Sequence, residues 1–163
     1  MNIRRAHPRE SEELSALAVS AKAVWGYSAQ QLGLWSGALR VSPESIASEP
    51  TFVAEENSRL VGVAQLATNC RPWGIECLWI HPAEIRRGVG SLLMRHVLTH
   101  ARANGQSELH IDSDPNAEAF YLRLGARRVG EIAAPIEGQL HRMRPQLALS
   151  IENAVPSARG LQR

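Results

Sequence analysis

The sequence has few cysteines, no long apolar run and no strong charge of one sign. Cys70 and Cys77 form no CxxC pair and match no metal-binding spacing, which argues against a disulfide-stapled domain or a cysteine-ligated metal. No apolar stretch approaches roughly 18 residues, so no membrane-spanning helix is expected. The first residues lack the apolar run of a secretory signal. These absences predict a cytoplasmic protein in a reducing compartment.

The charge balance excludes further classes of partner. Eighteen Lys and Arg residues against 16 Asp and Glu residues give a net charge of +2. This is too balanced for a general nucleic-acid or membrane-surface binder, so neither partner is expected. Lys22 is the single lysine in the chain. The excess of arginine suits bidentate phosphate binding, although a GC-rich coding bias would produce the same composition.

The hydrophobic pattern predicts an α/β protein with a mixed sheet and helices on its faces. The expected order is strand, helix, helix, three strands, helix, strand, helix and two strands. Strands are expected at 1–6, 51–56, 59–68, 73–80, 108–111, 126–132 and 140–151, and helices at 8–25, 29–39, 88–104 and 115–124. One domain over residues 1–152 and a loose tail over 153–163 follow from this pattern.

The glycine-containing segment that joins an apolar strand to an amphipathic helix has the features of an anion site. Gly88-Val89-Gly90 opens a helix whose free N–H groups and dipole favour negative charge. The glycines also lack the Cβ atoms that would hold a phosphate away from the backbone. Ser91-Leu92 replaces the Lys-Ser/Thr of a P-loop, and the third glycine of a dinucleotide fingerprint is missing. The pattern therefore favours a site for a pyrophosphate that belongs to neither ATP nor NAD. Glycines that serve only a tight turn would give the same sequence pattern.

Two segments resemble the GNAT superfamily of acyl-CoA-dependent N-acyltransferases. RRGVGSLL, after a strand that ends in LWIHP, resembles the acyl-CoA site of that superfamily. DPNAEAFYLRLGARRVGE resembles its later motif, a helix that carries Phe-Tyr and ends at Gly. The resemblance covers residues 3–150 and implies a mostly antiparallel, twisted sheet of about seven strands. It also implies an N-acetyltransferase that moves the acetyl group of acetyl-CoA to a primary amine by direct attack in a ternary complex.

The resemblance further implies where the co-substrate acetyl-CoA binds. The backbone N–H groups of residues 86–91 would hold the pyrophosphate, and the backbone of Trp79 and Ile80 would pair with the pantetheine arm. The strand 73–80 would diverge from the strand 108–111 to open the slot. Ile85 and Asp114 replace residues that are usual in the family, and Asn116 could substitute for the second. The cofactor-binding residues implied are Trp79, Ile80, Arg86, Arg87, Gly88, Val89, Gly90, Ser91, Asn116, Phe120 and Tyr121.

Two side chains are predicted to handle protons. Tyr121, which the resemblance places near the thioester sulfur, has an unperturbed pKa of about 10 that suits a general acid for the leaving thiolate. The alternative is an aromatic residue packed beside Phe120. Glu76 lies inside an apolar strand, where a charge is costly without a partner or a function. With regular alternation it would share a face with Leu78 and Ile80 and could serve as the base for the amine; a solvated or ion-paired carboxylate is the alternative.

The acceptor side is less clearly marked in the sequence. Trp25, Tyr27 and Trp35 flank the first two helices, which form the acceptor side in the GNAT superfamily. They could line an amine pocket or be ordinary core aromatics. His96 and His100 have i, i+4 spacing, but no carboxylate or cysteine completes a metal set, so no metal is predicted.

Two questions about the protein as a whole stay open from the sequence. The expected acceptor is a small-molecule or peptide amine, and the chain could be a monomer or a homodimer. The alternative function is a non-catalytic acyl-CoA-binding or sensing module on the same fold.

Overall fold

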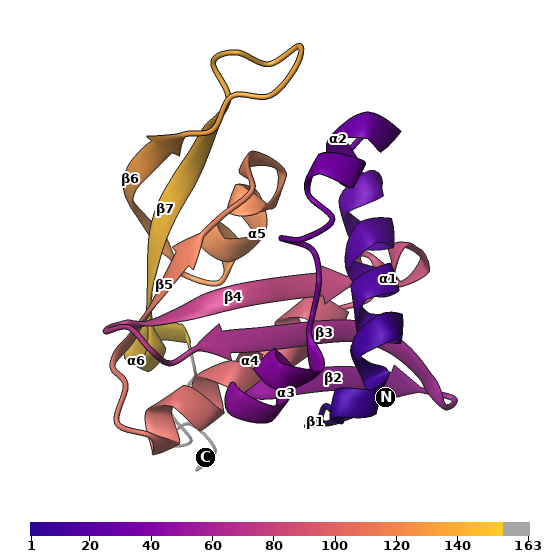
Figure 1. Cartoon of the computed structure of the whole chain (residues 1–163). Coiled ribbons are helices and arrows are strands. Elements are labelled where there is room, and N and C mark those ends of the chain that lie inside the picture. Colours follow the sequence, from indigo (N-terminus) through magenta and orange to yellow (C-terminus); the bar gives the residue numbers. More distant parts are fainter. Residues whose placement is uncertain (155–163) are drawn as a thin grey trace.

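A seven-stranded sheet runs through the computed structural model, which describes residues 1–154 (Figure 1). Its strands are β1 (Asn2–Arg5), β2 (Thr51–Glu56), β3 (Arg59–Ala67), β4 (Trp73–Ile80), β5 (Glu108–Asp112), β6 (Arg127–Ala133) and β7 (Met143–Ser150). The spatial order is β1-β2-β3-β4-β5-β7-β6, and every neighbouring pair is antiparallel except β4 and β5. The predicted mixed, mostly antiparallel sheet is therefore confirmed.

Helices cover both faces of this sheet. The α-helices are α1 (Ser11–Ala23), α2 (Ala29–Leu34), α3 (Pro43–Ser48), α4 (Val89–Ala103), α5 (Glu118–Arg123) and α6 (Ile151–Ala154), and the 3-10 turns are η1 (Pro8–Glu10), η2 (Pro82–Glu84) and η3 (Pro115–Ala117). In Figure 1, α1 and α3 lie in front of the sheet and α4 lies behind it. Across residues 1–154, no helix is both long and apolar enough to cross a bilayer.

Several predicted boundaries differ from the structure. The helix expected over 29–39 ends at Leu34, in a segment where Gly33 and Gly37 weaken helical propensity. The last strand begins at Met143 instead of residue 140, and Ile151 already belongs to α6. Residues 153 and 154, predicted as tail, also lie in α6, whereas 155–163 fall outside the described residues.

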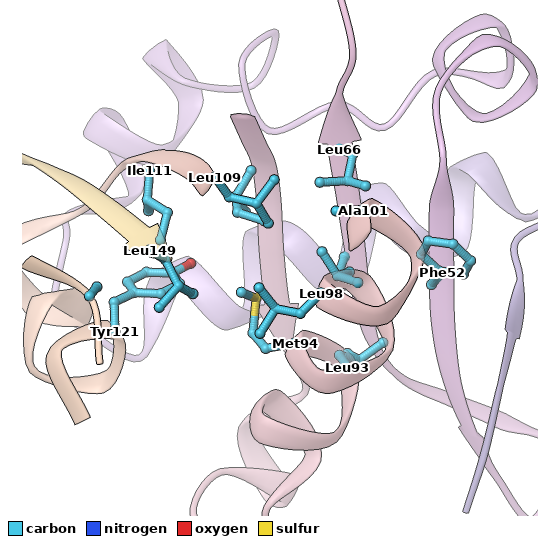
Figure 2. Close-up of a cluster of buried hydrophobic side chains, with 14 of the residues drawn as sticks. Phe52, Leu66, Leu93, Met94, Leu98, Ala101, Leu109, Ile111, Tyr121 and Leu149 are labelled. Atoms are coloured by element: carbon cyan, nitrogen blue, oxygen red, sulfur yellow. The ribbon is translucent and has the colours of Figure 1, made fainter. Parts of the chain in front are cut away.

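The core consists of two apolar clusters separated by the sheet. The larger one joins α4 to the sheet and includes Leu66, Leu93, Met94 and Leu98 (Figure 2). The smaller one, which includes Leu14, Leu17, Val53 and Val63, joins α1 to the opposite face. Because β3 is buried on both faces, its predicted central position is confirmed.

A gap opens in the middle of the sheet where β4 and β5 separate. These strands pair only from Trp73 with Leu109 to Ile75 with Ile111. Beyond that point, no strand of residues 1–154 pairs with β4 on its β5 side, and Figure 1 shows the two strands diverging. The divergence predicted for strands 73–80 and 108–111 is confirmed, and it leaves backbone groups of Glu76–Ile80 without a strand partner there.

A bulge in β4 changes the expected direction of Glu76. Cys77 pairs with Gln65 and Ile75 pairs with Leu66, so Glu76 is an extra residue in the ladder. Ile75 and Leu78 contact the larger cluster, whereas Cys77 contacts the smaller one. The expectation that the strand alternates regularly through Glu76 is therefore wrong, because the bulge interrupts the alternation there, whereas residues 77–80 do alternate between the two clusters.

Candidate active site

The loop before α4 has the backbone shape of an anion site. Arg86 and Gly88 both have positive φ angles, of 66° and 82°, and Gly88 is the N-cap of α4. Residues with positive φ angles that alternate with ordinary ones turn the N–H groups of a loop into one concavity. The N–H groups of Val89, Gly90 and Ser91 belong to the first turn of the helix. The N–H of Arg87 already donates to the Glu84 carbonyl over 3.2 Å. The predicted cradle therefore relies on the N–H groups of the other five residues.

The two glycines of this loop are required for different reasons. Gly88 adopts a left-handed conformation that strains other residues. A Cβ on Gly90 would lie 3.2 Å from Cζ of Phe120, so the missing side chain makes room for α5. Gly90 therefore has a packing reason for lacking a side chain, in addition to the predicted approach of a phosphate to the backbone.

The arginine side chains of the loop are not equally available. The guanidinium of Arg87 pairs with the buried carboxylate of Glu84, and its Nη1 lies 3.7 Å from Glu56. Arg86 instead lines a cavity of about 420 Å³ between β4, α4 and α5, which we term the loop cavity. Every predicted cofactor residue except Arg87 lines it, namely Trp79, Ile80, Arg86, Gly88, Val89, Gly90, Ser91, Asn116, Phe120 and Tyr121.

A second cavity, of about 280 Å³, lies on the other side of β4 and is lined by charged and aromatic side chains. We term it the charged cavity. Its principal side chains are Lys22, Trp25, Trp35, Glu76, Trp79, Asp114, Tyr121, Arg142 and Arg144. Trp25, Leu78, Trp79, Ala117 and Tyr121 line both cavities. The two cavities therefore meet at the diverging part of β4 and at α5.

Tyr121 lies at this junction and is also part of the core. It is 6% exposed, and its ring contacts that of Phe120 edge-on at a centroid distance of 5.1 Å. Figure 2 shows it at the margin of the larger cluster, which also holds Met94 and Leu149. Burial, with a smaller contribution from Cys77, raises the pKa of the Tyr121 hydroxyl. The phenol thus stays protonated at neutral pH, as a proton donor must.

The two neighbouring residues of β4, Glu76 and Cys77, differ in chemistry. Glu76 is exposed and lines the charged cavity. Burial raises the pKa of the Cys77 thiol to about 12. A thiol of this kind is almost wholly protonated at neutral pH, which makes it a poor nucleophile for an acyl group.

A buried ionic cluster that the sequence did not reveal forms one wall of the charged cavity. Oδ2 of Asp114 accepts hydrogen bonds from Lys22 Nζ at 2.5 Å, from Tyr27 Oη at 2.8 Å and from Arg142 Nη2 at 3.0 Å. The side chains of Lys22, Asp114 and Arg142 are 10%, 6% and 4% exposed. Burial lowers the pKa of Lys22 and, on its own, would raise that of Asp114. The hydrogen bond from Lys22 and the further donors outweigh burial at Asp114, so the pKa of its carboxyl is lowered overall.

Aromatic rings surround the Lys22 ammonium. Nζ lies 4.8 to 5.7 Å from the ring centroids of Trp25, Tyr27, Trp35 and Trp79. Such contacts favour a cation. The predicted residues Trp25 and Trp35 line the charged cavity, while Tyr27 contributes its hydroxyl to Asp114. None of the three belongs to either apolar cluster, so the core interpretation of these aromatics is wrong.

Asn116 and the histidine pair have local partners. Nδ2 of Asn116 donates to Asp114 at 2.9 Å and to Tyr27 Oη at 3.2 Å. The ring centroids of His96 and His100 lie 4.6 and 5.2 Å from that of Phe52. Burial lowers the pKa of His100. Within the part of the chain that the structure describes, no three metal-ligating side chains gather into a group.

Lys22, Asp114 and Arg142 were missed as site residues because they lie far apart in the sequence. The status of Lys22 as the single lysine was the one available signal.

Known proteins resemble this chain in both sequence and fold. The uncharacterized N-acetyltransferase YafP of Escherichia coli is 29% identical over 133 residues, which are 79% of this chain and 83% of that protein. A GCN5-related N-acetyltransferase structure from Rhodopseudomonas palustris superposes with a TM-score of 0.75 at 23% identity, covering 91% of this chain and 94% of the other. The PaiA N-acetyltransferase of Thermoplasma acidophilum, solved with coenzyme A, gives a TM-score of 0.72 at 16% identity, with coverages of 91% and 98%.

The family assignment rests on a match that spans most of the fold. The model of the acetyltransferase (GNAT) domain matches residues 27–144, from the loop before α2 to the start of β7. This range includes the loop before α4, the divergence of β4 and β5, and Tyr121. The chain belongs to the GNAT family of acetyltransferases.

Proposed function

We propose that this acetyltransferase moves the acetyl group of acetyl-CoA to the primary amine of a small-molecule or peptide acceptor by direct attack in a ternary complex. The observation that carries the proposal is the separation of β4 from β5. It lets the loop cavity and the charged cavity meet at Tyr121 and Trp79. Two reactants that enter from opposite sides would thus approach each other at one point.

The loop cavity has the features that acetyl-CoA requires. The N–H groups around Gly88 and the N-terminus of α4, a helix of 15 residues, suit a pyrophosphate. The edge of β4 at Trp79 and Ile80 would hydrogen-bond an extended amide chain as an added strand does. The complex of the PaiA N-acetyltransferase with coenzyme A supports the same choice of co-substrate.

The residues at the junction match the proton transfers of acyl transfer. Bound acetyl-CoA supplies a thioester, whose C–S bond breaks as the acceptor nitrogen forms a C–N bond. Tyr121, which burial keeps protonated, would donate its proton to the departing sulfur. Glu76 lines the charged cavity and would remove the proton of the amine, directly or through water. A backbone N–H of the unpaired β4 segment would stabilise the oxyanion.

Two measurements test the proposal separately. Calorimetry should detect acetyl-CoA binding that free ATP and NAD do not compete with. Release of the coenzyme A thiol should then depend on an added amine, and mass spectrometry should find the acetyl group on that amine. Binding without amine-dependent thiol release would contradict the catalytic proposal and favour a binding or sensing role.

A further inference from the structure

Arg142 is a buried cation with an unused donor on the wall of the charged cavity. Its Nη1 donates to the Ala134 carbonyl at 3.1 Å, and its Nη2 donates to Asp114 and Tyr27. Its Nε is buried and has no hydrogen-bond partner within residues 1–154. A buried N–H without a partner is costly, and the more so when it belongs to a charged group.

A second arginine offers the same group nearby. Arg144 follows two residues later and also lines the charged cavity, as expected for residues that share one side of an extended segment. Its Nη2 pairs with Asp112 at 2.6 Å, while its Nε, like that of Arg142, is buried and lacks a partner among the described residues. Two guanidinium groups on one stretch of chain thus line the charged cavity, and each has a buried Nε–H without a hydrogen-bond partner among the described residues.

The charge of the buried cluster also calls for an anion. Lys22 and Arg142 share the single carboxylate of Asp114, so the three charged groups sum to +1 with the lysine protonated. All three side chains are at least nine-tenths buried, and unpaired charge is expensive in such a place. Of the other charged side chains that line the cavity, Arg144 pairs with Asp112 and Glu76 is exposed, so a carboxylate bound beside Arg142 would neutralise the buried positive charge.

We propose that the acceptor is a small amine that also carries a carboxylate, and that the guanidinium groups of Arg142 and Arg144 bind this carboxylate. The inference rests on the proposed acetyl transfer and names the substrate class of the same site. The indole rings of Trp25 and Trp35, which line the cavity, supply apolar contact for the body of the acceptor. Its amine would lie toward Tyr121, which lines both cavities, and toward Glu76, which lines the charged cavity.

Matched acceptor pairs test the proposal with the intact chain. Each pair consists of an amino acid and its carboxamide, and phenylalanine, leucine and alanine provide the first three pairs. An aminophosphonate and an amine that lacks any acid group are tested beside them. The carboxylate member is expected to be acetylated with a kcat/KM about ten- to a hundredfold higher, the usual value of hydrogen bonds to charged groups. A preference for the carboxamides or the acid-free amine overturns the proposal, and a preference for the aminophosphonate replaces carboxylate by phosphonate recognition.

A readout without turnover separates this inference from the proposed function. Amine-free carboxylates such as 3-phenylpropanoate should raise the melting temperature of the complex with coenzyme A, and their carboxamides should not. Stabilisation by carboxylates without acetylation of any amine would support the anion site and contradict the catalytic proposal. Absence of stabilisation by any of these carboxylates, together with acetylation of acid-free amines, would overturn the anion site alone.

Variants locate the site. Arg142→Gln should reduce the carboxylate-to-carboxamide ratio to near one while the KM for acetyl-CoA stays unchanged, and Arg142→Lys should restore part of the ratio. Because Arg142 is buried and its loss can impair folding, the half-exposed Arg144→Gln is the second variant, with a smaller loss of the ratio expected. Arg127→Gln, which removes an exposed arginine paired with Glu108, is the matched control. An unchanged ratio in folded Arg142→Gln and Arg144→Gln contradicts the assignment.

Discussion

The loop cavity and the charged cavity are built in opposite ways. The proposed binding groups of the first come from consecutive residues, 86–91, and mainly from their backbone. The second is lined by a cluster of side chains at positions 22, 114 and 142, which come from three separate segments of the chain. A backbone site of this kind leaves a short motif in the sequence. A side-chain site assembled from distant positions leaves almost none.

The two cavities also differ in how their charges are compensated. In the loop, Arg87 is neutralised by Glu84 and Glu56, so the proposed anion affinity would reside in N–H groups and the α4 dipole. In the charged cavity, two buried cations share one carboxylate. Substitutions in the loop should therefore change the KM for acetyl-CoA, whereas substitutions in the charged cavity should change stability and the preference among acceptors.

The largest effect is expected at Tyr121, which is one of the residues that line both cavities. Tyr121→Phe should lower kcat by about 10²- to 10⁴-fold, the usual contribution of a positioned proton donor, with little change in the KM for acetyl-CoA. The ring and its packing stay in place, so circular dichroism and the melting temperature should be preserved. Steady-state kinetics with saturating acetyl-CoA measure the effect. Unaltered turnover would reduce Tyr121 to a packed core residue.

The next effect is on stability and belongs to the charged cavity. Asp114→Asn keeps the shape of the side chain but leaves Lys22 and Arg142 without a counter-charge. We expect the free energy of unfolding, measured with urea at pH 7, to fall by roughly 3–5 kcal/mol. Glu108→Gln, which breaks the exposed pair with Arg127, should cost at most about 1 kcal/mol. Equal losses in the two variants would mean that the buried cluster is no stronger than a surface ion pair.

The loss of unfolding free energy in Asp114→Asn should depend on pH, and it should become smaller toward acid. The folded-state pKa of Asp114 is lowered below the ordinary value of 3.8, so its ionised form stabilises the folded state. That stabilisation is fully present above the unfolded pKa and is lost as the pH falls through the folded one. The gap in unfolding free energy between wild type and Asp114→Asn should stay constant from pH 7 to about 5 and shrink below pH 4. A gap that widens toward acid would contradict the assignment.

A smaller effect is expected at Glu76. Glu76→Gln should lower kcat/KM by about 10²-fold, the lower end of the usual range, and shift the acidic limb of its pH profile, because the proton acceptor for the amine is lost. Glu131→Gln, which changes an exposed carboxylate on β6, is the matched control. An unchanged acidic limb would leave Glu76 as a bulge residue without a catalytic part.

The sequence predicted the loop side of the site more completely than the acceptor side. The mixed sheet with helices on both faces followed from hydrophobic periodicity and agrees with the structure. The divergence of β4 and β5 and the cofactor residues were implied by the resemblance of two motifs to the GNAT superfamily. The strands do diverge, and ten of the eleven residues proposed for the cofactor line the loop cavity. The direction of Glu76 could not be predicted, because a bulge depends on how β3 and β4 pair and leaves no mark in the composition of β4.

The charged cavity shows the limit more clearly. The aromatic residues near α1 and α2 were found, but the cation that they surround was not, because a lysine on a helix is ordinarily solvated. Asp114 was noted only for departing from a family pattern, while its role as the shared partner of Lys22 and Arg142 depends on contacts between remote elements. Such contacts become visible only once the chain is folded.

The smallest expected effect separates backbone binding from backbone strain at the two ends of α4. Gly88 and Gly105 flank this helix with φ angles of 82° and 75°, and a Cβ at either position would meet no heavy atom within 4 Å in the described structure. Alanine at either site should therefore cost about 1 kcal/mol of unfolding free energy, from the left-handed conformation alone.

Only one of these glycines belongs to the loop cavity, so only one should affect the co-substrate. Gly88→Ala should raise the KM for acetyl-CoA by roughly tenfold. Strain at the left-handed position would turn the N–H groups of the loop away from the pyrophosphate. Gly105→Ala should leave that KM unchanged at the same loss of stability. Equal KM values in the two variants would show that the loop tolerates the strain without using its backbone to bind, and the anion affinity would then have to come from the Arg86 side chain.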